Sequence, residues 1–261
     1  MNKENKTALI TGASSGIGRD LAREFAKRGY NLIIVARDKS KLDNLSKELE
    51  KENKIKVHSI SMDLSDGENC KKLYKAAKQI DENIDILINN AGFGTFGNFT
   101  KTDLEKEINL INTNITAVHI LTKLFLDDMK KRNEGYILNV SSIASFMPGP
   151  LMAAYYASKA YVTRLSEAIR EELRKEKSNV KISVLCPGPV NTNFNNVANV
   201  KFNLASLSSE YVAKYTVKKL LKNKFMIVPG TNIKLLRIIA KISPNNITAK
   251  FVYKMQKRKQ G

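Results

Sequence analysis

Short apolar runs recur along the chain and alternate with longer amphipathic segments. Runs such as NLIIVA and IDILIN are apolar at nearly every position rather than at every second one. Continuous apolar character is typical of strands that are buried on both faces, as in a parallel sheet. Strands are therefore predicted at residues 7–11, 31–36, 56–61, 84–89, 135–141, 181–186 and 225–229.

The segments between these runs repeat their apolar residues with the period of a helix. GIGRDLAREFAKRG ends at Gly29, a residue suited to terminate a helix. Strands and helices that alternate without interruption predict right-handed crossovers and a doubly wound, mainly parallel α/β sheet. No repeat or linker divides the chain, so one domain over residues 1–261 is expected. Helices are predicted at residues 16–29, 39–53, 67–80, about 103–132, about 151–175 and 208–224.

Composition limits the classes of protein to which this chain can belong. The only cysteines, Cys70 and Cys186, lie far apart without metal-ligand residues beside them, so neither a disulfide framework nor a metal site is predicted. The polar N-terminal lead and the absence of a long apolar run predict a cytoplasmic protein. The net charge of +19 comes from lysines spread over nearly every segment. A solvated basic surface is therefore favoured over a nucleic-acid partner.

The segment TGASSGIG joins the first predicted strand to the first helix. Gly12, Gly16 and Gly18 stand where the backbone must turn sharply and approach a ligand closely. The helix N-terminus would offer its N–H groups and dipole to an anion such as pyrophosphate. Because the spacing differs from G-x-G-x-x-G, a turn that merely permits packing is the alternative for this motif alone.

The end of the second predicted strand bears on the choice of cofactor. In dinucleotide-binding folds an acidic residue there holds the adenosine ribose, whereas an arginine accommodates a 2′-phosphate. Here the strand ends at Ala36 and Arg37 follows, which favours NADP(H) over NAD(H). Asp38 would become the ribose acid if the strand ran one residue further.

The segment YYASK contains two tyrosines ahead of a lysine. On a helix Tyr155 and Lys159 share a face, whereas Tyr156 has Ala160 at that spacing. A phenol is a poor base at neutral pH, and a neighbouring ammonium lowers its pKa. Tyr155 is therefore the reactive candidate, and Tyr156 is interpreted as a packing or lining residue.

Two serines end the fifth predicted strand in NVSSIAS. Ser141 and Ser142 lie at the carboxyl edge of the sheet, where ligands bind in open α/β folds. One of these hydroxyls could stabilise charge on a substrate carbonyl oxygen. Strand-end serines also cap turns, and Tyr-x-x-x-Lys occurs in many helices. Chance nevertheless explains poorly that both follow a glycine-rich first turn in this order.

Together these motifs resemble those of the short-chain dehydrogenase/reductase family over roughly residues 5–230. TGASSGIG is similar to the family's TGxxxGxG loop, NNAG to its fourth-strand motif, YYASK to its YxxxK helix and CPGPVNTNF to its segment after the sixth strand. The resemblance implies a seven-stranded Rossmann fold and an NADP(H)-dependent oxidoreductase that interconverts a ketone and a secondary alcohol. The C-terminal tail is similar to that of members grouped with ketoacyl and hydroxysteroid reductases.

The resemblance also implies roles for catalytic residues. Tyr155 exchanges a proton with the substrate oxygen, and Lys159 lowers its pKa and binds the nicotinamide ribose. The family's serine lies thirteen positions before the tyrosine, which selects Ser142. Asn114, in INTNITAVHIL, anchors a water that links Lys159 to a proton relay. The hydride chemistry belongs to the cofactor.

Three further segments are implied to contact the cofactor. Asp63 and Leu64 should lie by the adenine, NNAG by the adenosine ribose, and PGPVNT by the nicotinamide amide. The complete expected cofactor set is Gly12, Ser14, Ser15, Gly16, Ile17, Gly18, Arg37, Asp63, Leu64, Asn90, Ala91, Gly92, Tyr155, Lys159, Pro187, Gly188, Val190 and Thr192.

The expected substrate wall is apolar. It comprises Phe93, Phe96, residues 146–151 and residues 193–207, which hold scattered asparagines but no arginine cluster. An apolar substrate such as a hydroxysteroid, a bile acid, a 3-oxoacyl compound or a xenobiotic ketone therefore fits better than a sugar phosphate. Residues 193–207 are interpreted as a lid.

Residues 231–261 depart from the family pattern and hold two basic amphipathic segments around SPNN. This helical extension could cover the substrate pocket, contact another subunit or lie on an anionic membrane. Pocket cover or subunit contact is favoured, because short apolar faces usually bury in protein. A homodimer or homotetramer is implied by the family.

A non-catalytic NADP(H)-binding sensor or scaffold with the same fold is the alternative function. The intact set of Ser142, Tyr155 and Lys159 argues against it, because a pure sensor has no need of all three.

Overall fold

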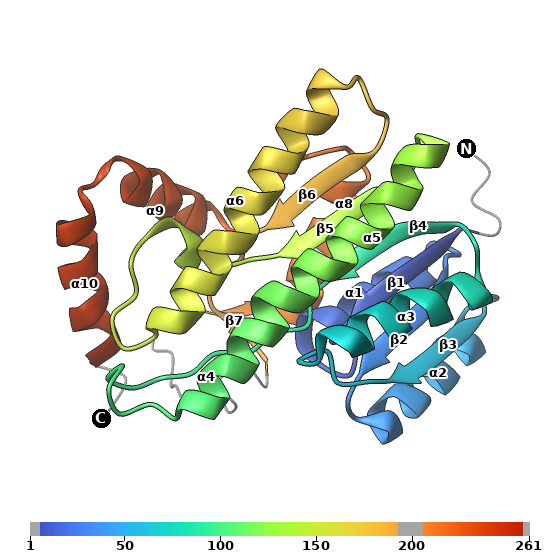
Figure 1. Ribbon diagram of the computed structural model, residues 1–261, viewed down its shortest axis with the longest axis horizontal. Helices are drawn as coiled ribbons and strands as arrows, with labels where there is room; N and C mark the ends of the chain where they lie inside the picture. Colours follow the sequence, from blue (N-terminus) through green and yellow to red (C-terminus); the bar gives the residue numbers. More distant parts are fainter. Residues whose placement is uncertain (1–5, 193–205, 258–261) are drawn as a thin grey trace.

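The computed structural model describes residues 6–192 and 206–257. Within them, seven parallel strands form one sheet in the order β3-β2-β1-β4-β5-β6-β9, with helices on both faces (Figure 1). The predicted doubly wound parallel sheet is therefore confirmed. Its strands are β1 (Thr7–Thr11), β2 (Asn31–Ala36), β3 (Val57–Ser61), β4 (Ile84–Asn89), β5 (Tyr136–Val140), β6 (Lys181–Leu185) and β9 (Met226–Ile227).

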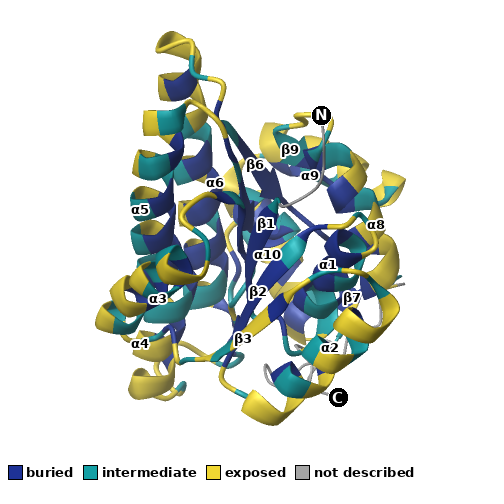
Figure 2. Cartoon of the chain, turned by 90° about the vertical axis from the view of Figure 1, so that its right-hand side faces the viewer, coloured by how far each residue is buried: buried dark blue, intermediate teal, exposed yellow. Residues whose placement is uncertain are grey.

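The helices form two layers that enclose the sheet (Figure 2). One layer consists of α1 (Gly16–Ala26), α2 (Lys39–Glu52) and α8 (Ser209–Leu220). The other consists of α3 (Gly67–Ile80), α4 (Leu104–Ile111), α5 (Ala117–Arg132) and α6 (Ala153–Lys175).

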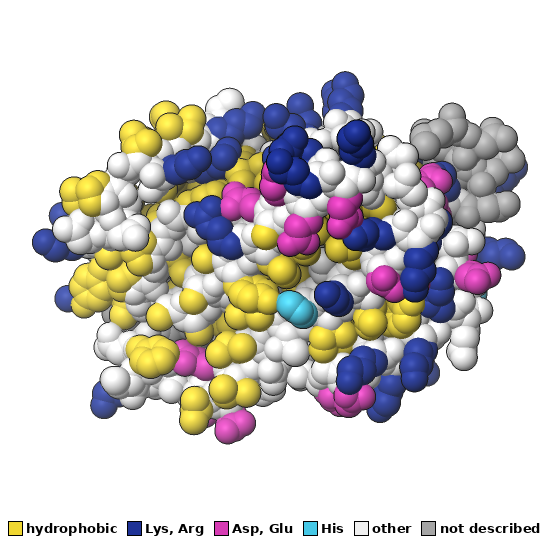
Figure 3. Space-filling model, turned by 45° about the horizontal axis from the view of Figure 1, so that its top comes forward, with side chains coloured by type: hydrophobic (Ala, Val, Ile, Leu, Met, Phe, Trp, Pro, Cys, Tyr) yellow, Lys and Arg dark blue, Asp and Glu magenta, His cyan; other side chains and the backbone are white. Residues whose placement is uncertain are grey.

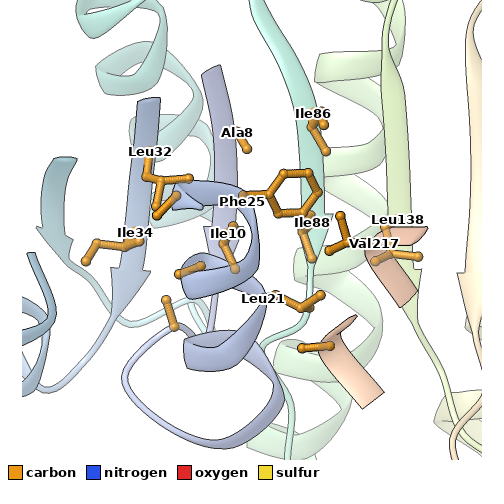
Figure 4. Close-up of a cluster of buried hydrophobic side chains, with 14 of the residues drawn as sticks. Ala8, Ile10, Leu21, Phe25, Leu32, Ile34, Ile86, Ile88, Leu138 and Val217 are labelled. Carbon is orange, nitrogen blue, oxygen red and sulfur yellow. The ribbon is translucent and has the colours of Figure 1, made fainter. Parts of the chain in front are cut away.

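The central strands consist mainly of apolar residues because both of their faces are covered. Ile10 of β1 packs with Phe25 of α1 under one helical layer (Figure 4), whereas its neighbour Leu9 packs with Phe125 of α5 under the other. All four side chains are buried. Because successive side chains of a strand point to opposite faces, one apolar run contributes to two hydrophobic cores.

The order in which the chain adds strands to the sheet reverses at β1. Strand β1 pairs with β2 on one side and with β4 on the other, so the chain order reverses between β1 and β4. The loops that follow these two strands consequently leave the sheet side by side. Such a switch point is where ligands bind in open α/β sheets.

The predicted long helix 103–132 contains an irregularity. Between α4 and α5 lies a π-helical turn, η1 (Asn112–Thr116). Turns of this kind occur frequently at functional sites. Asn114 lies in this turn and is completely buried.

The chain ends in two helices that stand at one end of the molecule (Figure 1). They are α9 (Thr231–Ile242) and α10 (Asn245–Lys257), separated by Ser243 and Pro244. A short 3-10 helix, η2 (Ile143–Phe146), follows β5 and contacts both α6 and α9. The small strands β7 (Val190–Asn191) and β8 (Leu207–Ser208) pair with each other.

No helix within residues 6–192 and 206–257 combines the length and apolar character that crossing a bilayer requires.

Candidate active site

A cavity of about 650 Å³ opens at the carboxyl ends of the strands, at the switch point between β1 and β4. Its volume lies within the usual range for ligand pockets. We call the part lined by the loops after β1, β2, β3 and β4 the cofactor end, and the part lined by η2, α6, α9 and α10 the substrate end. The expected cofactor residues that line the cavity are Gly12, Ser14, Ser15, Gly16, Ile17, Arg37, Asp63, Leu64, Asn90, Ala91, Gly92, Tyr155, Lys159, Pro187, Gly188, Val190 and Thr192.

Gly18 is absent from this lining, in contrast to the expectation. A Cβ atom at position 18 would lie 2.3 Å from the carbonyl oxygen of Gly12 and 2.4 Å from Nδ2 of Asn90. Gly18 therefore lets helix α1 pack closely behind the glycine-rich loop. Its contribution to the site is space for the backbone and not a contact with the cavity.

Asn90 joins the loops after β1 and β4. Its Nδ2 donates to the carbonyl oxygens of Thr11, at 2.9 Å, and Gly12, at 3.1 Å. In return, the N–H groups of Asn90 and Ala91 each donate to Oγ1 of Thr11 at 3.0 Å. The side chain of Asn90 thus fixes the glycine-rich loop against its neighbour at the cofactor end.

Helix α1 begins without a side-chain cap. Ser15 is its N-cap residue and makes no side-chain capping bond, and the first turn holds no acidic residue. By contrast, Asp38, Asp66 and Asp103 cap α2, α3 and α4. Unsatisfied N–H groups at a helix N-terminus suit an anionic ligand. The cofactor end therefore fits the pyrophosphate of a dinucleotide.

The end of β2 lies where it was predicted, at Ala36, so Asp38 stands outside the strand. Its carboxylate accepts from the N–H of Lys41 at 3.0 Å and pairs with Nζ of Lys41 at 2.7 Å. These contacts hold the pKa of Asp38 below its ordinary value. Arg37 and Lys41 both line the cavity here, and Arg37 is exposed. This part of the cavity wall therefore holds two cations, Arg37 and Lys41, and one carboxylate, Asp38, which is paired with Lys41.

The two candidate serines point to different partners. Ser142 lies beside Tyr155 and, against the effect of burial, lowers the pKa of its phenol, and Oγ of Ser142 accepts from the N–H of Ala144 at 3.1 Å. Ser141 instead donates to the carbonyl oxygen of Lys159 at 2.8 Å. Ser142 and Tyr155 therefore meet at the cavity wall, whereas Ser141 fixes β5 against α6.

The expected effect of Lys159 on Tyr155 is wrong for this structure. Nζ of Lys159 donates to the carbonyl oxygen of Val140 at 2.9 Å and lies 5.8 Å from the centroid of the Tyr155 ring. Burial raises the pKa of Tyr155 to about 12 and outweighs the opposing hydrogen bond with Ser142. Burial also lowers the pKa of Lys159 to about 8. Tyr155 is therefore protonated at neutral pH.

Asn114 lies behind the cavity wall and does not line it. Its Nδ2 donates to the carbonyl oxygen of Phe93 at 2.9 Å and to Oγ of Ser158 at 3.0 Å, and its Oδ1 accepts from the N–H of Phe93 at 3.1 Å. A Cβ atom on Gly92 would lie 2.8 Å from this Oδ1 and 3.4 Å from Nζ of Lys159. The Asn114 side chain thus holds the loop after β4, and its role in a water relay stays a prediction.

The substrate end differs from the expected wall. Phe93 and Met147 line the cavity, but Phe96 and Phe146 do not. Phe96 packs in the cluster that contains Tyr156, and Phe146 packs in the cluster around Cys186 and Val228. Both rings therefore support the wall from behind. Residues 193–205 of the expected wall lie outside the described part of the chain. Lining residues that the sequence did not reveal include Met152, Ile233, Leu236, Met255 and Gln256.

Gln256 gives the substrate end a buried amide. Its Nε2 donates to the hydroxyl oxygen of Tyr156 at 3.0 Å, and the side chain is 1% exposed. Its Oε1 is buried and has no hydrogen-bond partner among the described residues. Tyr156 lines the cavity, as predicted. Nothing in the sequence indicated that a residue 100 positions away would meet it.

The described residues hold no cluster of His, Cys, Asp and Glu side chains that could bind a metal ion. Burial raises the pKa of Cys186 to about 11, so this cysteine is a neutral thiol at physiological pH.

A dinucleotide-type cavity lined by a neighbouring serine and tyrosine, with a lysine one helical turn further on, is typical of an α/β oxidoreductase. The chain belongs to the short chain dehydrogenase family, whose model matches residues 6–201. Members of this family use a nicotinamide cofactor, and the uncapped start of α1 and the glycine-rich loop fit one.

Named relatives and solved structures agree with this assignment. Very-long-chain 3-oxoacyl-CoA reductase-A from Danio rerio is 36% identical over 176 residues, which cover 66% of this chain and 54% of that protein. The chain thus spans about half the length of that relative. Ketoacyl reductase HetN from Nostoc sp. is 34% identical over 256 residues, covering 93% of this chain and 86% of that protein. A short-chain dehydrogenase from Sphingobium yanoikuyae, solved in complex with NADPH, superposes with a TM-score of 0.81 at 30% identity over 87% of this chain and 88% of that one.

Proposed function

We propose that this protein is an NADP(H)-dependent oxidoreductase that interconverts an apolar ketone and its secondary alcohol. One observation carries the proposal: Ser142 and Tyr155 meet at the wall of a dinucleotide-type cavity, where Ser142 acts on the phenol of Tyr155. Lys159 stands one turn further along α6, with its ammonium beside Gly92. This combination supports proton exchange with a substrate oxygen.

Tyr155 is the proposed proton donor in the direction of reduction. Its raised pKa, about 12, keeps the phenol protonated at neutral pH, as a general acid requires. Ser142 already accepts from the N–H of Ala144, which leaves its hydroxyl hydrogen available to a substrate carbonyl. Two hydroxyl groups would then stabilise charge that develops on that oxygen. The bound cofactor supplies or accepts the hydride.

Lys159 and the glycine-rich loop are proposed to hold the cofactor. The ammonium of Lys159 would bind the nicotinamide ribose, and the free N–H groups at the start of α1 would bind the pyrophosphate. Asn90 keeps this loop in position through its bonds to Thr11 and Gly12.

The preference for NADP(H) rests on the two cations beyond β2. Arg37 and Lys41 line the cavity where the adenosine ribose would lie, and a guanidinium binds phosphate well. Asp38 is engaged as the cap of α2 and as the partner of Lys41, which reduces its availability to ribose hydroxyls. A 2′-phosphate is the charge that complements this wall.

The substrate is proposed to have an apolar body with one polar group beyond the reacting carbon. The substrate end offers the thioethers of Met147, Met152 and Met255 and the amide of Gln256. Because Oε1 of Gln256 is buried and has no partner in the part of the chain that the structure describes, a hydroxyl on the substrate would satisfy it. A hydroxysteroid-like or 3-oxoacyl ketone of this kind fits best.

The proposal is tested by following NADPH absorbance with hydroxysteroid ketones, 3-oxoacyl thioesters and aryl ketones, with NADH in parallel. NADPH binding is measured separately by fluorescence. We expect NADPH to be oxidised with at least one ketone class and NADH to be used poorly. Tight NADPH binding without turnover of any ketone, or of the matching alcohols with NADP⁺, would contradict the proposal and favour a non-catalytic sensor.

A further inference from the structure

Helix α9 is apolar on two opposite sides. Ile233 and Leu236 face the cavity and Ala240 is buried, at spacings that place them on one side of the helix. The opposite side is also apolar but lies in solvent, with Ile242 77% exposed. Its exposed residues are Leu235, Ile238, Ile239 and Ile242. A helix that is apolar on both sides ordinarily buries both of them.

Helix α10 repeats this division. Val252 and Gln256 are buried on the inner side, and the outer side carries the exposed Ile247 and Phe251. Two exposed lysines lie on that same outer side, because positions 247, 250, 251 and 254 share one helical face. Large apolar side chains and lysines thus alternate over one surface. We call the exposed sides of α9 and α10 the outer face.

Every charged side chain in the segment that forms α9 and α10 is positive. Residues 231–257 contain no aspartate or glutamate, although the whole chain has 25 acidic residues. No ion pair involves any cation of this segment within the described residues. Its cations are Lys234, Arg237, Lys241, Lys250, Lys254 and Lys257.

The outer face lies at one end of the molecule. Figure 3 keeps the end formed by α9 and α10 at its left, where hydrophobic and basic side chains lie next to each other. A second copy of the chain packed there by two-fold symmetry would bring these cations against one another. An anionic lipid surface would instead neutralise them and also accept the exposed apolar side chains.

We propose that the outer face of α9 and α10 docks the protein on an anionic membrane surface. Ile238, Ile242 and Phe251 insert among the lipids at the interface, and the lysine stems lie along the apolar region with their ammonium groups at the phosphates. The inner sides of the same helices line the substrate end of the cavity. Docking therefore places the substrate end beside the lipid, where apolar compounds concentrate. The proposal goes beyond the reaction and does not depend on it.

The test is sedimentation with vesicles of phosphatidylcholine alone and of phosphatidylcholine mixed with phosphatidylserine. The wild type should bind the mixed vesicles and bind phosphatidylcholine weakly. An Ile238→Glu/Ile242→Glu variant should bind the mixed vesicles at least about tenfold more weakly. A Lys250→Gln/Lys254→Gln variant should bind roughly 10- to 30-fold more weakly, because each lysine near the surface contributes about fivefold.

Leu104→Glu is the matched control. Leu104 is 67% exposed at the start of α4 and is not part of the outer face, and an acid suits a helix N-terminus. This variant should bind the mixed vesicles as the wild type does. Circular dichroism and thermal midpoints verify that the variants fold, and a salt titration of the wild type gives a second reading without substitution.

Several outcomes would overturn the proposal. One is the absence of wild-type binding to the mixed vesicles, and another is binding that salt does not weaken. Undiminished binding of a folded Ile238→Glu/Ile242→Glu variant would do so as well. A dimer in solution that this variant dissociates would assign the outer face to a second copy of the chain.

Discussion

The cofactor end and the substrate end of the cavity are built in different ways. Loops that directly follow adjacent strands form the cofactor end, and backbone groups and a few fixed side chains such as Asn90 hold them together. The substrate end instead joins η2 and α6 to helices from the far end of the chain. The first therefore tolerates little change in the backbone, whereas the second can change its chemistry through single side chains.

The largest effect on cofactor binding is expected for a substitution at Gly18, where the cofactor end leaves no space for a side chain. A Gly18→Ala variant should bind NADPH at least about 100-fold more weakly, because the new methyl group would collide with the Gly12 carbonyl and displace the loop. Fluorescence titration measures the affinity. Gly29→Ala is the control, since nothing lies within 4 Å of a Cβ at Gly29, and any strain from its positive φ falls far from the cavity lining. An unchanged NADPH affinity in a folded Gly18→Ala variant would contradict the close packing.

The next effect is a difference in pH dependence between the two directions of reaction. With a pKa of about 12, Tyr155 holds its proton throughout the neutral range. Ketone reduction should thus vary little in kcat from about pH 6 to about pH 10, whereas alcohol oxidation should rise about tenfold per pH unit. Steady-state kinetics in both directions provide the test. Alcohol oxidation that levels off near neutral pH would show that the phenol ionises there.

The pKa of Lys159 leads to a separate prediction, about the pH dependence of cofactor binding. Its pKa, lowered by burial to about 8, leaves the ammonium charged below that pH and neutral above it. NADPH binding should weaken as pH rises through about 8, because the contact to the ribose loses its charge. Titration of NADPH at several pH values measures this. A Lys159→Met variant should bind with no such step, and a step that persists in it would assign the titration to another group.

A smaller effect is expected for discrimination between cofactors. An Arg37→Ala/Lys41→Ala variant should lose roughly 10- to 100-fold in kcat/KM with NADPH, because charge-assisted bonds to the 2′-phosphate disappear. Its kcat/KM with NADH should change little. Equal losses with both cofactors would mean that these side chains support the fold and do not read the phosphate.

The smallest predicted effect lies at the substrate end. A Gln256→Leu variant should raise KM about tenfold for a ketone that carries a distal hydroxyl, because the hydroxyl loses its acceptor. The matched ketone without that hydroxyl should be reduced equally well or better. A KM that rises equally for both ketones would show that Gln256 serves only to hold Tyr156.

The fold followed from the sequence where local physics decides it. Strands buried on both faces form mainly apolar runs, and β1, β2 and β4 begin and end where they were predicted. At one edge of the sheet, β9 is only Met226–Ile227 and is shorter than the predicted strand 225–229. The π-helical turn inside the predicted long helix left no signal in the apolar pattern.

The site was predictable to the extent that it consists of motifs. The glycine-rich loop and YYASK pointed to the cavity wall, and the family resemblance selected Ser142 as the neighbour of Tyr155. The direction of the Tyr155 pKa shift was not predictable, because burial depends on the whole surrounding structure. Gln256 was not predictable either, since its neighbour Tyr156 lies far away in the sequence.

The tyrosine pair provides the most direct test of the account. Tyr155→Phe and Tyr156→Phe remove one hydroxyl each from neighbouring positions of α6, and single-turnover reduction of a ketone by bound NADPH measures each variant. Tyr155→Phe should reduce the rate by about 100- to 10,000-fold with NADPH affinity preserved, and Tyr156→Phe should change it less than about tenfold. Near wild-type turnover by Tyr155→Phe would contradict the assignment of Tyr155 as the proton donor.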